Sequence, residues 1–196
     1  EPFKPIFGCE MYVARRSMHD KEKDKHDNSG YHLIVLAKNY NGYKNLIKLV
    51  SHAWVDGYYY KPRTDREELE KYHEDLIVCS ACIAGEVPNK IIRGDIEGAR
   101  EACEWYHRVF GDDYYLELQR HEVKDPTLVA NREAYPLQQK ANKVLMQFAK
   151  EYGIKLVCTN DCHFEDKETA EAHDHLLCLS TNEDLDDPKR MRYSKQ

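Results

Sequence analysis

The segment Leu76–Ser80, with the sequence LIVCS, is a continuous apolar run of strand length. Such a run is typical of a strand that is buried on both faces of a sheet. The pattern after it predicts a helix over Ile96–Phe110 and then a strand over Tyr114–Gln119, which reads YYLELQ. Strands that are separated by helices of this length favour a parallel sheet or a β/α barrel. The sequence therefore predicts an α/β fold.

The alternation of strands and helices extends toward both ends of the chain. Upstream, two β-prone runs flank a polar, charged stretch, Arg16–Gly30, which is expected to be a mobile loop. Downstream, Pro136 is expected at the first position of a long helix and Gly153 at its end. The remaining predicted elements are strands at Ile6–Val13, His32–Ala37 and Ile154–Thr159, and helices at Asn41–Trp54, Asp65–Tyr72, Pro136–Tyr152 and Lys167–Ser180. No internal repeat or linker divides them, so we predict one domain.

The composition is that of an ordinary globular protein, with 41% hydrophobic and 33% charged residues in 196. No apolar run reaches the ~20 residues that span a bilayer, so no membrane partner is expected. The net charge of -6 argues against a strong, sequence-independent grip on nucleic acid by this chain alone. Seven cysteines without an export signal indicate cytoplasmic thiols or metal ligands rather than disulfides.

Ligand-type side chains gather at or near the ends of the predicted strands, where α/β folds place their chemistry. Glu10 lies on the first strand, His32 opens the second, and Cys82 follows LIVCS. Asp161 and His163 follow the strand at Ile154–Thr159 and are close enough to reach one cluster from a single loop. Carboxylate, imidazole and thiolate are ligands of zinc and similar divalent ions. Each residue alone also has an ordinary interpretation: an ion pair for Glu10, a packed or surface histidine for His32, and a small buried hydrophobe for Cys82.

Two other patterns compete with this metal site. Cys79, Cys82, Cys158 and Cys162 could form a four-cysteine zinc site, and the same CxxC could be a redox motif. Placement of Cys79 and Cys158 inside predicted strands disfavours the zinc reading, because no turn lets the thiolates converge. The run 58–63 (YYYKPR) combines aromatic rings with two cations and could bind a nucleic-acid strand. Packing of these rings on the helix that carries Trp54 explains them equally well.

Eight stretches in a fixed order resemble one known family. They are IFGCEMYVA (6–14), HLIVLAKN (32–39), GYKNL (42–46), LIVCSACIAGEV (76–87), YLELQ (115–119), TNDCHF (159–164), AHD (172–174) and LDDPKRMR (185–192). Together they resemble the PHP (polymerase and histidinol phosphatase) domain of bacterial DNA polymerase III alpha subunits. The resemblance covers essentially the whole chain and is far more specific than any single motif.

The resemblance implies a distorted, TIM-like (β/α)7 barrel that holds up to three metal ions. The family's ligand motifs match Glu10, His32, Cys82, and Asp161 with His163 in this chain. An opening His-x-His and a Thr-Asp-His motif are absent, so residues 1–196 look like the larger, C-terminal part of the domain. Residues 185–196 look like the start of the exit toward the polymerase palm.

The function implied by the resemblance is metal-dependent phosphoester hydrolysis, most specifically 3′–5′ exonuclease proofreading. Glu10 would bridge two cations, and Asp161 with His163 would fix another, with zinc or manganese in this site and magnesium in the parent polymerase. DNA and other replisome subunits would be the partners. His121 could line the cavity or lie on the surface. The alternatives are a non-catalytic scaffold for polymerase assembly and a free-standing phosphoesterase, the latter disfavoured by the ending LDDPKRMRYS. The chain alone is expected to be inactive and to bind metal weakly.

Overall fold

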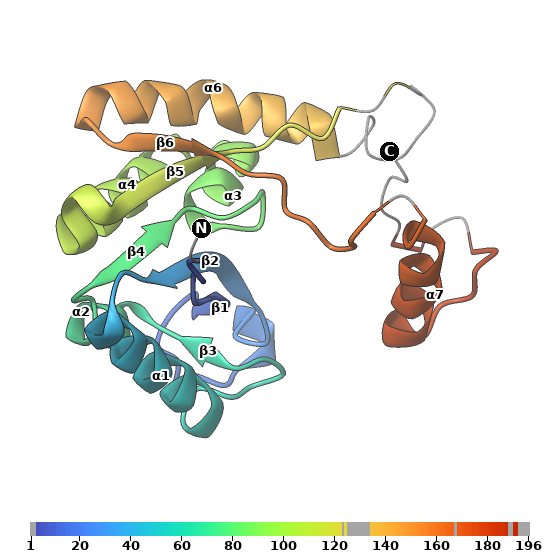
Figure 1. Ribbon diagram of the computed structural model, residues 1–196, viewed down its shortest axis with the longest axis horizontal. Helices are drawn as coiled ribbons and strands as arrows, with labels where there is room; N and C mark the ends of the chain where they lie inside the picture. The colour runs from blue at the N-terminus through green and yellow to red at the C-terminus, as the bar shows by residue number, and fades with distance from the viewer. Residues whose placement is uncertain (1–2, 123, 125–133, 167, 188–189, 192–196) are drawn as a thin grey trace.

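A single six-stranded sheet organises the chain (Figure 1). The computed structural model describes residues 3–122, 124, 134–166, 168–187 and 190–191. The strands lie in the order β3-β1-β2-β4-β5-β6. Their bounds are Gly8–Ala14 (β1), Gly30–Ala37 (β2), Arg63–Thr64 (β3), Leu76–Cys79 (β4), Tyr114–Leu118 (β5) and Lys155–Cys158 (β6).

The sheet is mixed, which corrects part of the prediction. Strands β4, β5 and β6 are parallel, as their helical connections require, and β1 is parallel to β3. However, β2 is antiparallel to both β1 and β4. The segment between β1 and β2 contains no crossover helix, and a direct return of the chain produces an antiparallel pair. The six described strands form an open sheet, so the α/β class is confirmed and these residues contain no closed barrel.

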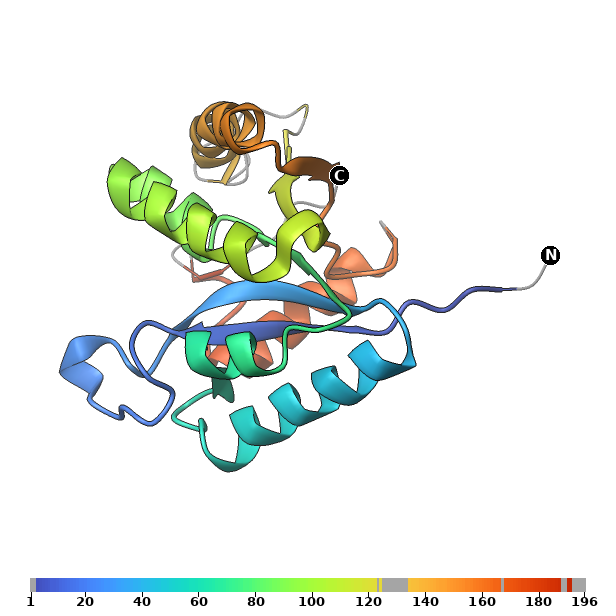
Figure 2. The same ribbon diagram turned by 90° about the vertical axis from the view of Figure 1, so that its left-hand side faces the viewer.

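Helices cover one face of the sheet, and the candidate site residues lie on the other. In the pairing register, Met11, Leu33, Val35, Val78 and Leu116 share a face and form one core cluster with residues of the helices. Figures 1 and 2 show α1 and α2 beside the β1–β3 part of the sheet, and α3, α4 and α6 beside the β4–β6 part. The helices are Tyr40–Val55 (α1), Arg66–Lys71 (α2), Glu86–Arg93 (α3), Ile96–Phe110 (α4), Ala134–Tyr152 (α6) and Ala170–Thr181 (α7), with 3-10 turns at Lys23–Lys25 and Gly111–Asp113.

Local signals in the sequence placed several helix ends correctly. The Asp65 carboxylate accepts a hydrogen bond from the backbone N–H of Glu68 and so caps α2. Gly153, with φ of 69°, follows the last residue of α6, as predicted. Pro136 is the third residue of α6 as described rather than the first, which still places it in the first turn. Helix α3 and the short strand β3 were not predicted.

The stretch Arg16–Gly30, expected to be mobile, is instead fixed by a buried arginine. The guanidinium of Arg63, whose side chain is fully buried, donates hydrogen bonds to backbone carbonyls of Met18 (2.7 Å), Asp20 (3.0 Å) and Asp27 (2.7 Å) within this loop. A fourth bond, of 3.0 Å, reaches the carbonyl of Gly57. In a mobile loop these backbone carbonyls would accept hydrogen bonds from water. Here they accept from the buried Arg63, which holds the loop in place.

The C-terminal part of the described chain lies apart from the sheet. An extended segment leads from β6 to α7, which Figure 1 shows beside rather than upon the sheet. The guanidinium of Arg190 contacts both carboxylate oxygens of Asp174 at 2.6 Å and ties the chain after α7 back to this helix. Lys167, the expected first residue of this helix, and most of the expected exit segment 185–196 lie outside the described residues. Across the described residues, no helix combines the length and apolarity needed to cross a membrane.

Candidate metal centre

Glu10 and His32 form the centre of the candidate site. Glu10 pairs with Ile34 across the antiparallel β1–β2 ladder, so His32 is its diagonal neighbour on the same face. The Nδ1 atom of His32 lies 2.5 Å from Oε1 of Glu10. This hydrogen bond lowers the pKa of Glu10, and the contacts of His32 with Cys82 and Glu10 raise its own pKa to about 10. Without a bound cation, the imidazole and carboxylate therefore form an ion pair.

Cys82 joins this pair through a tight loop after β4, residues 80–85, here named the Cys82 loop. The backbone N–H of His32 donates to the carbonyl of Ala84 at 3.1 Å, which fastens the loop to β2. A Cβ atom on Gly85 would lie 2.0 Å from the carbonyl oxygen of Ser80, so only glycine allows the loop to fold back this closely. The result places Sγ of Cys82 3.8 Å from Nδ1 of His32.

Asp161 and His163 follow β6 on a second loop, residues 159–164, here named the Asp161 loop. The Nε2 atom of His163 lies 3.5 Å from Oδ1 of Asp161. After the hydrogen bond from His32, the charge of His163 also contributes to the lowered pKa of Glu10, which places the Asp161 loop near Glu10 of β1. Asp161 has a left-handed backbone, with φ of 48°, that non-glycine residues adopt rarely. The five residues predicted from the sequence thus lie as a contacting trio, in which Glu10 and Cys82 each contact His32, and a neighbouring pair.

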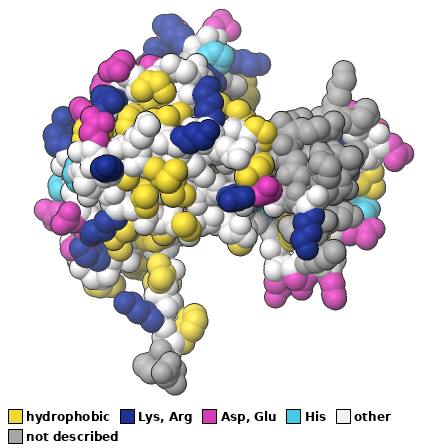
Figure 3. All heavy atoms as spheres, turned by 90° about the horizontal axis from the view of Figure 1, so that it is seen from above, with side chains coloured by type: hydrophobic (Ala, Val, Ile, Leu, Met, Phe, Trp, Pro, Cys, Tyr) yellow, Lys and Arg dark blue, Asp and Glu magenta, His cyan; other side chains and the backbone are white. Residues whose placement is uncertain are grey.

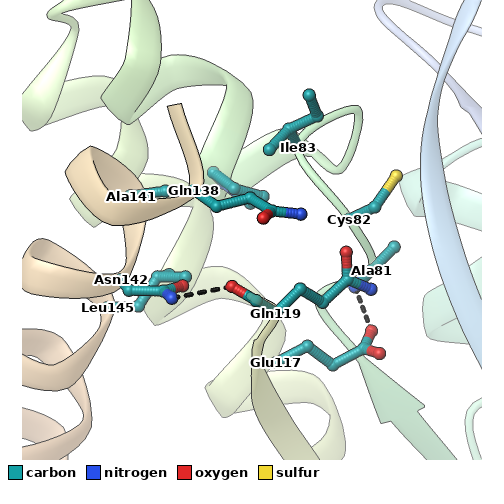
Figure 4. Close-up of a pocket in the computed structure, with 10 residues that line it drawn as sticks. Ala81, Cys82, Ile83, Glu117, Gln119, Gln138, Ala141, Asn142 and Leu145 are labelled. Carbon is teal, nitrogen blue, oxygen red and sulfur yellow. Dashed lines mark hydrogen bonds between the residues drawn. The ribbon is translucent and has the colours of Figure 1, made fainter. Parts of the chain in front are cut away.

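A sixth polar residue, Glu117, was missed by the sequence analysis. It lies on the site face of β5, is 5% exposed, and accepts a hydrogen bond from the hydroxyl of Thr159 at 2.7 Å. Its other oxygen accepts from the backbone N–H of Ala81 (Figure 4). Burial, with the negative charges of Asp161 and Glu10, raises its pKa. The signal was available, because Glu117 is a lone carboxylate within the apolar run YYLELQ.

A small pocket adjoins the site between the Cys82 loop, β5 and α6. Its lining includes Cys82, Glu117, Gln119, Gln138 and Asn142, several of which appear in Figure 4. His121 lies close to this region but does not line the pocket. Its Nε2 is 2.9 Å from the carbonyl oxygen of Asn160 and its Nδ1 is 2.8 Å from Nε2 of Gln138. His121 therefore contacts Asn160, the residue before Asp161, and does not line this pocket.

Comparison with known proteins places this chain in a family. The family model described as PHP domain matches residues 2–121. The chain belongs to the PHP domain family. DNA polymerase III subunit alpha of Borreliella burgdorferi is 42% identical over 189 residues, and that of Thermus aquaticus is 40% identical over 191. These matches cover 96% and 97% of the chain but only 15% of each relative. The subunit of Treponema pallidum is 41% identical over 194 residues, covering 98% of the chain and 16% of the relative.

The donor set of this PHP domain suits a divalent cation, although its geometry is not that of a finished site. Two carboxylates, two imidazoles and one thiol are the side chains that zinc and manganese sites use. Within the described part of the chain, which includes all five candidates, no group of three or more His, Cys, Asp or Glu residues is arranged to hold a metal ion. Metal binding would therefore require the Asp161 loop to approach the contacting trio.

The competing sequence patterns find little support in the PHP domain. All seven cysteines are free thiols, Cys79 is buried in β4, and both Cys158 and Cys162 are exposed, which argues against a four-cysteine site. Tyr58 stacks on Trp54 with ring centroids 5.6 Å apart, which confirms the packing interpretation for this ring. Arg63 is fully buried and so cannot contact a nucleic-acid strand.

Proposed function

We propose that this PHP domain is the metal-dependent phosphoesterase part of a DNA polymerase III alpha subunit, with 3′–5′ exonuclease proofreading as its reaction. One observation carries the proposal: Glu10 and Cys82, from two separate segments, both contact His32 on the face of the sheet that the helices leave uncovered. The similarity to alpha subunits over 96% or more of the chain supports the polymerase setting. In a polymerase of this kind, the partners would be DNA and other replisome subunits, and the location would be the cytoplasm.

The five candidate residues would hold the cations in two groups. Glu10 would bridge two cations, with His32 and Cys82 as further ligands of one, and Asp161 with His163 would hold another. Clustered cations lower the pKa of bound water and stabilise the leaving oxygen of a phosphodiester. They would also offset the charge of -6, which opposes a phosphate backbone. On the face seen in Figure 3, Lys and Arg side chains are scattered among acidic and uncharged ones.

The fold of the intact domain is part of the same proposal. The open sheet would belong to the seven-stranded TIM-like barrel that the family resemblance implies. In that barrel the site face of β1, β2 and β5 would point inward. Residues 185–196 would lead toward the polymerase palm, and magnesium would serve the polymerase reaction rather than this site.

Replacement of Asp161 tests the reaction. In the full-length gene product, Asp161→Ala should reduce release of nucleotides from a 3′-labelled primer by at least about 100-fold, because loss of a cation ligand removes several kcal/mol of transition-state stabilisation. Glu165→Ala, which removes an exposed carboxylate shortly after the Asp161 loop, is the matched control. DNA synthesis measured on the same preparations shows whether each variant is intact.

The second candidate function is a scaffold for polymerase assembly without catalysis. The absence of a preformed three-ligand group among the described residues favours it. Equal nuclease activity in the wild type and Asp161→Ala, with DNA synthesis intact in both, would support the scaffold and overturn the nuclease. Hydrolysis of small phosphate esters without activity on primer ends would instead indicate a free-standing phosphoesterase.

A further inference from the structure

We propose that Glu117 is a positioning residue, whose carboxylate holds the Cys82 loop and the Asp161 loop together so that their ligands can share a cation. This inference rests on the proposed metal site and deepens it. Both of its oxygens accept hydrogen bonds from the two loops, so we assign Glu117 the holding of these loops rather than ligation of the cation.

The contacts of Glu117 link three strand ends. Oε2 accepts from the backbone N–H of Ala81, immediately before Cys82, and Oε1 accepts from the hydroxyl of Thr159 at 2.7 Å, two residues before Asp161. The backbone N–H of Glu117 also donates to Oγ of Ser80 at 2.8 Å. One residue near the C-terminal end of β5 therefore reaches the first residues of both loops.

The direction of the hydrogen bonds requires an acceptor at this position. The side-chain amide of Gln119 donates to Oγ1 of Thr159 at 3.1 Å, which leaves the Thr159 hydroxyl proton for Glu117. The backbone N–H of Ala81 can only donate. An ionised carboxylate satisfies both donors, whereas a glutamine has one acceptor and one donor and would lose one of the two bonds.

The loop backbone adds a reason for a strong tether. Ala81 has a left-handed conformation, with φ of 61°, and so does Asp161. For residues other than glycine this conformation is unfavourable and persists only where the surroundings hold it. The bond to Glu117 fixes the strained peptide of Ala81 in the orientation that turns Cys82 toward His32.

Comparison with Glu86, an equally buried carboxylate, sets Glu117 apart. Glu86 is 7% exposed and pairs with Arg66 and Lys90, each at 2.8 Å, which is the usual way to stabilise a buried charge. Among the described residues, Glu117 forms no ion pair with a lysine, arginine or histidine; its neighbours include the negative charges of Asp161 and Glu10. Burial of a carboxylate without a cationic partner costs free energy, and a bound cation nearby would offset that cost.

The experiment compares zinc affinity among variants of the full-length gene product, by competition with a chelating dye. Residues that orient metal ligands typically contribute 10–100-fold to affinity, so Glu117→Gln should weaken zinc binding by about that factor. Thr159→Val, which removes the hydroxyl with little change of shape, should act in the same direction, and Thr159→Ser should restore near-wild-type affinity. Glu86→Gln is the matched control: it should lower the melting temperature and leave zinc affinity unchanged.

The outcomes separate this inference from the proposed function. If Cys82→Ser and Asp161→Ala weaken zinc binding but Glu117→Gln does not, the metal site stands and the positioning role is wrong. Equal losses in Thr159→Val and Thr159→Ser would also overturn it, even if Glu117→Gln fails to fold. If Cys82→Ser and Asp161→Ala have no effect either, the metal site itself is wrong.

Discussion

The Sγ atom of Cys82 lies 3.8 Å from Nδ1 of His32, although the two residues are 50 positions apart in the chain. The same Nδ1 atom is 2.5 Å from the Glu10 carboxylate. The backbone bond from His32 to Ala84 and the close approach of Gly85 to Ser80 fix this arrangement. An imidazole in contact with both a thiol and a carboxylate is the part of the site that is already assembled.

Cobalt substitution is expected to reveal this thiol as a ligand. Replacement of zinc by Co²⁺ in the full-length gene product should give a thiolate-to-cobalt charge-transfer absorption, because thiolates bind such ions as the deprotonated form. The absorption should disappear in Cys82→Ser and persist in Cys162→Ser, whose thiol is exposed between Asp161 and His163. The opposite result, with loss only in Cys162→Ser, would move the thiolate ligand to the Asp161 loop.

The isolated 196-residue chain is expected to bind zinc weakly. The described residues contain no group of three or more candidate ligands in metal-binding geometry, so binding must first bring the Asp161 loop to Glu10 and His32. Structural zinc sites bind with about 10–16 kcal/mol, and we expect less than about 8 kcal/mol here, which corresponds to a Kd above about 1 µM. Titration calorimetry checks this value. Tight binding of two or more zinc ions by the isolated chain would contradict the prediction.

The sequence predicted those elements whose signals are local. The strand predicted at Leu76–Ser80 from its continuous apolar run is β4, Leu76–Cys79, and the helix predicted at Ile96–Phe110 is α4. Asp65 and Gly153 were placed by capping chemistry. Helix α3 was missed because Gly85 and Pro88 sit at its start and mask a short helical pattern. The antiparallel pairing of β2 was missed because the direction of a strand depends on how the chain connects it to its neighbours. Apolar periodicity carries no information on that connection.

The candidate residues were identifiable from the sequence, but their contacts were not. Glu10, His32 and Cys82 each had an ordinary interpretation, and only the family resemblance joined them. Their proximity depends on the β1–β2 register and on the Gly85 turn, neither of which a single sequence specifies. Glu117 was missed because its distinguishing feature is burial of a lone carboxylate within β5, which the residue pattern alone does not report.

Arg63→Met is expected to destabilise the protein strongly. Four backbone carbonyls that now accept from Arg63 would lose their donors in a buried setting. Each unsatisfied buried group costs about 1–3 kcal/mol, so the free energy of unfolding should fall by at least about 3 kcal/mol. Urea unfolding followed by tryptophan fluorescence measures the change. Arg108→Met, which removes an exposed partner of Glu70, should cost less than about 1 kcal/mol; similar losses in both variants would show that the loop does not depend on Arg63.

Asp27 is expected to make stability fall in acid. The Arg16 guanidinium lowers the pKa of Asp27 from 3.8 to about 2, with help from the backbone N–H of Glu22. Because the folded-state pKa lies below the unfolded one, this carboxylate stabilises the fold fully above about pH 5, and the effect is lost as the pH falls toward 2. The difference in unfolding free energy between the wild type and Asp27→Asn should therefore be constant near neutrality and shrink between about pH 4 and pH 2. Asp24→Asn, an exposed carboxylate on the same loop, controls for the change in net charge. A difference that grows in acid would mean that the Arg16–Asp27 contact does not stabilise the native loop.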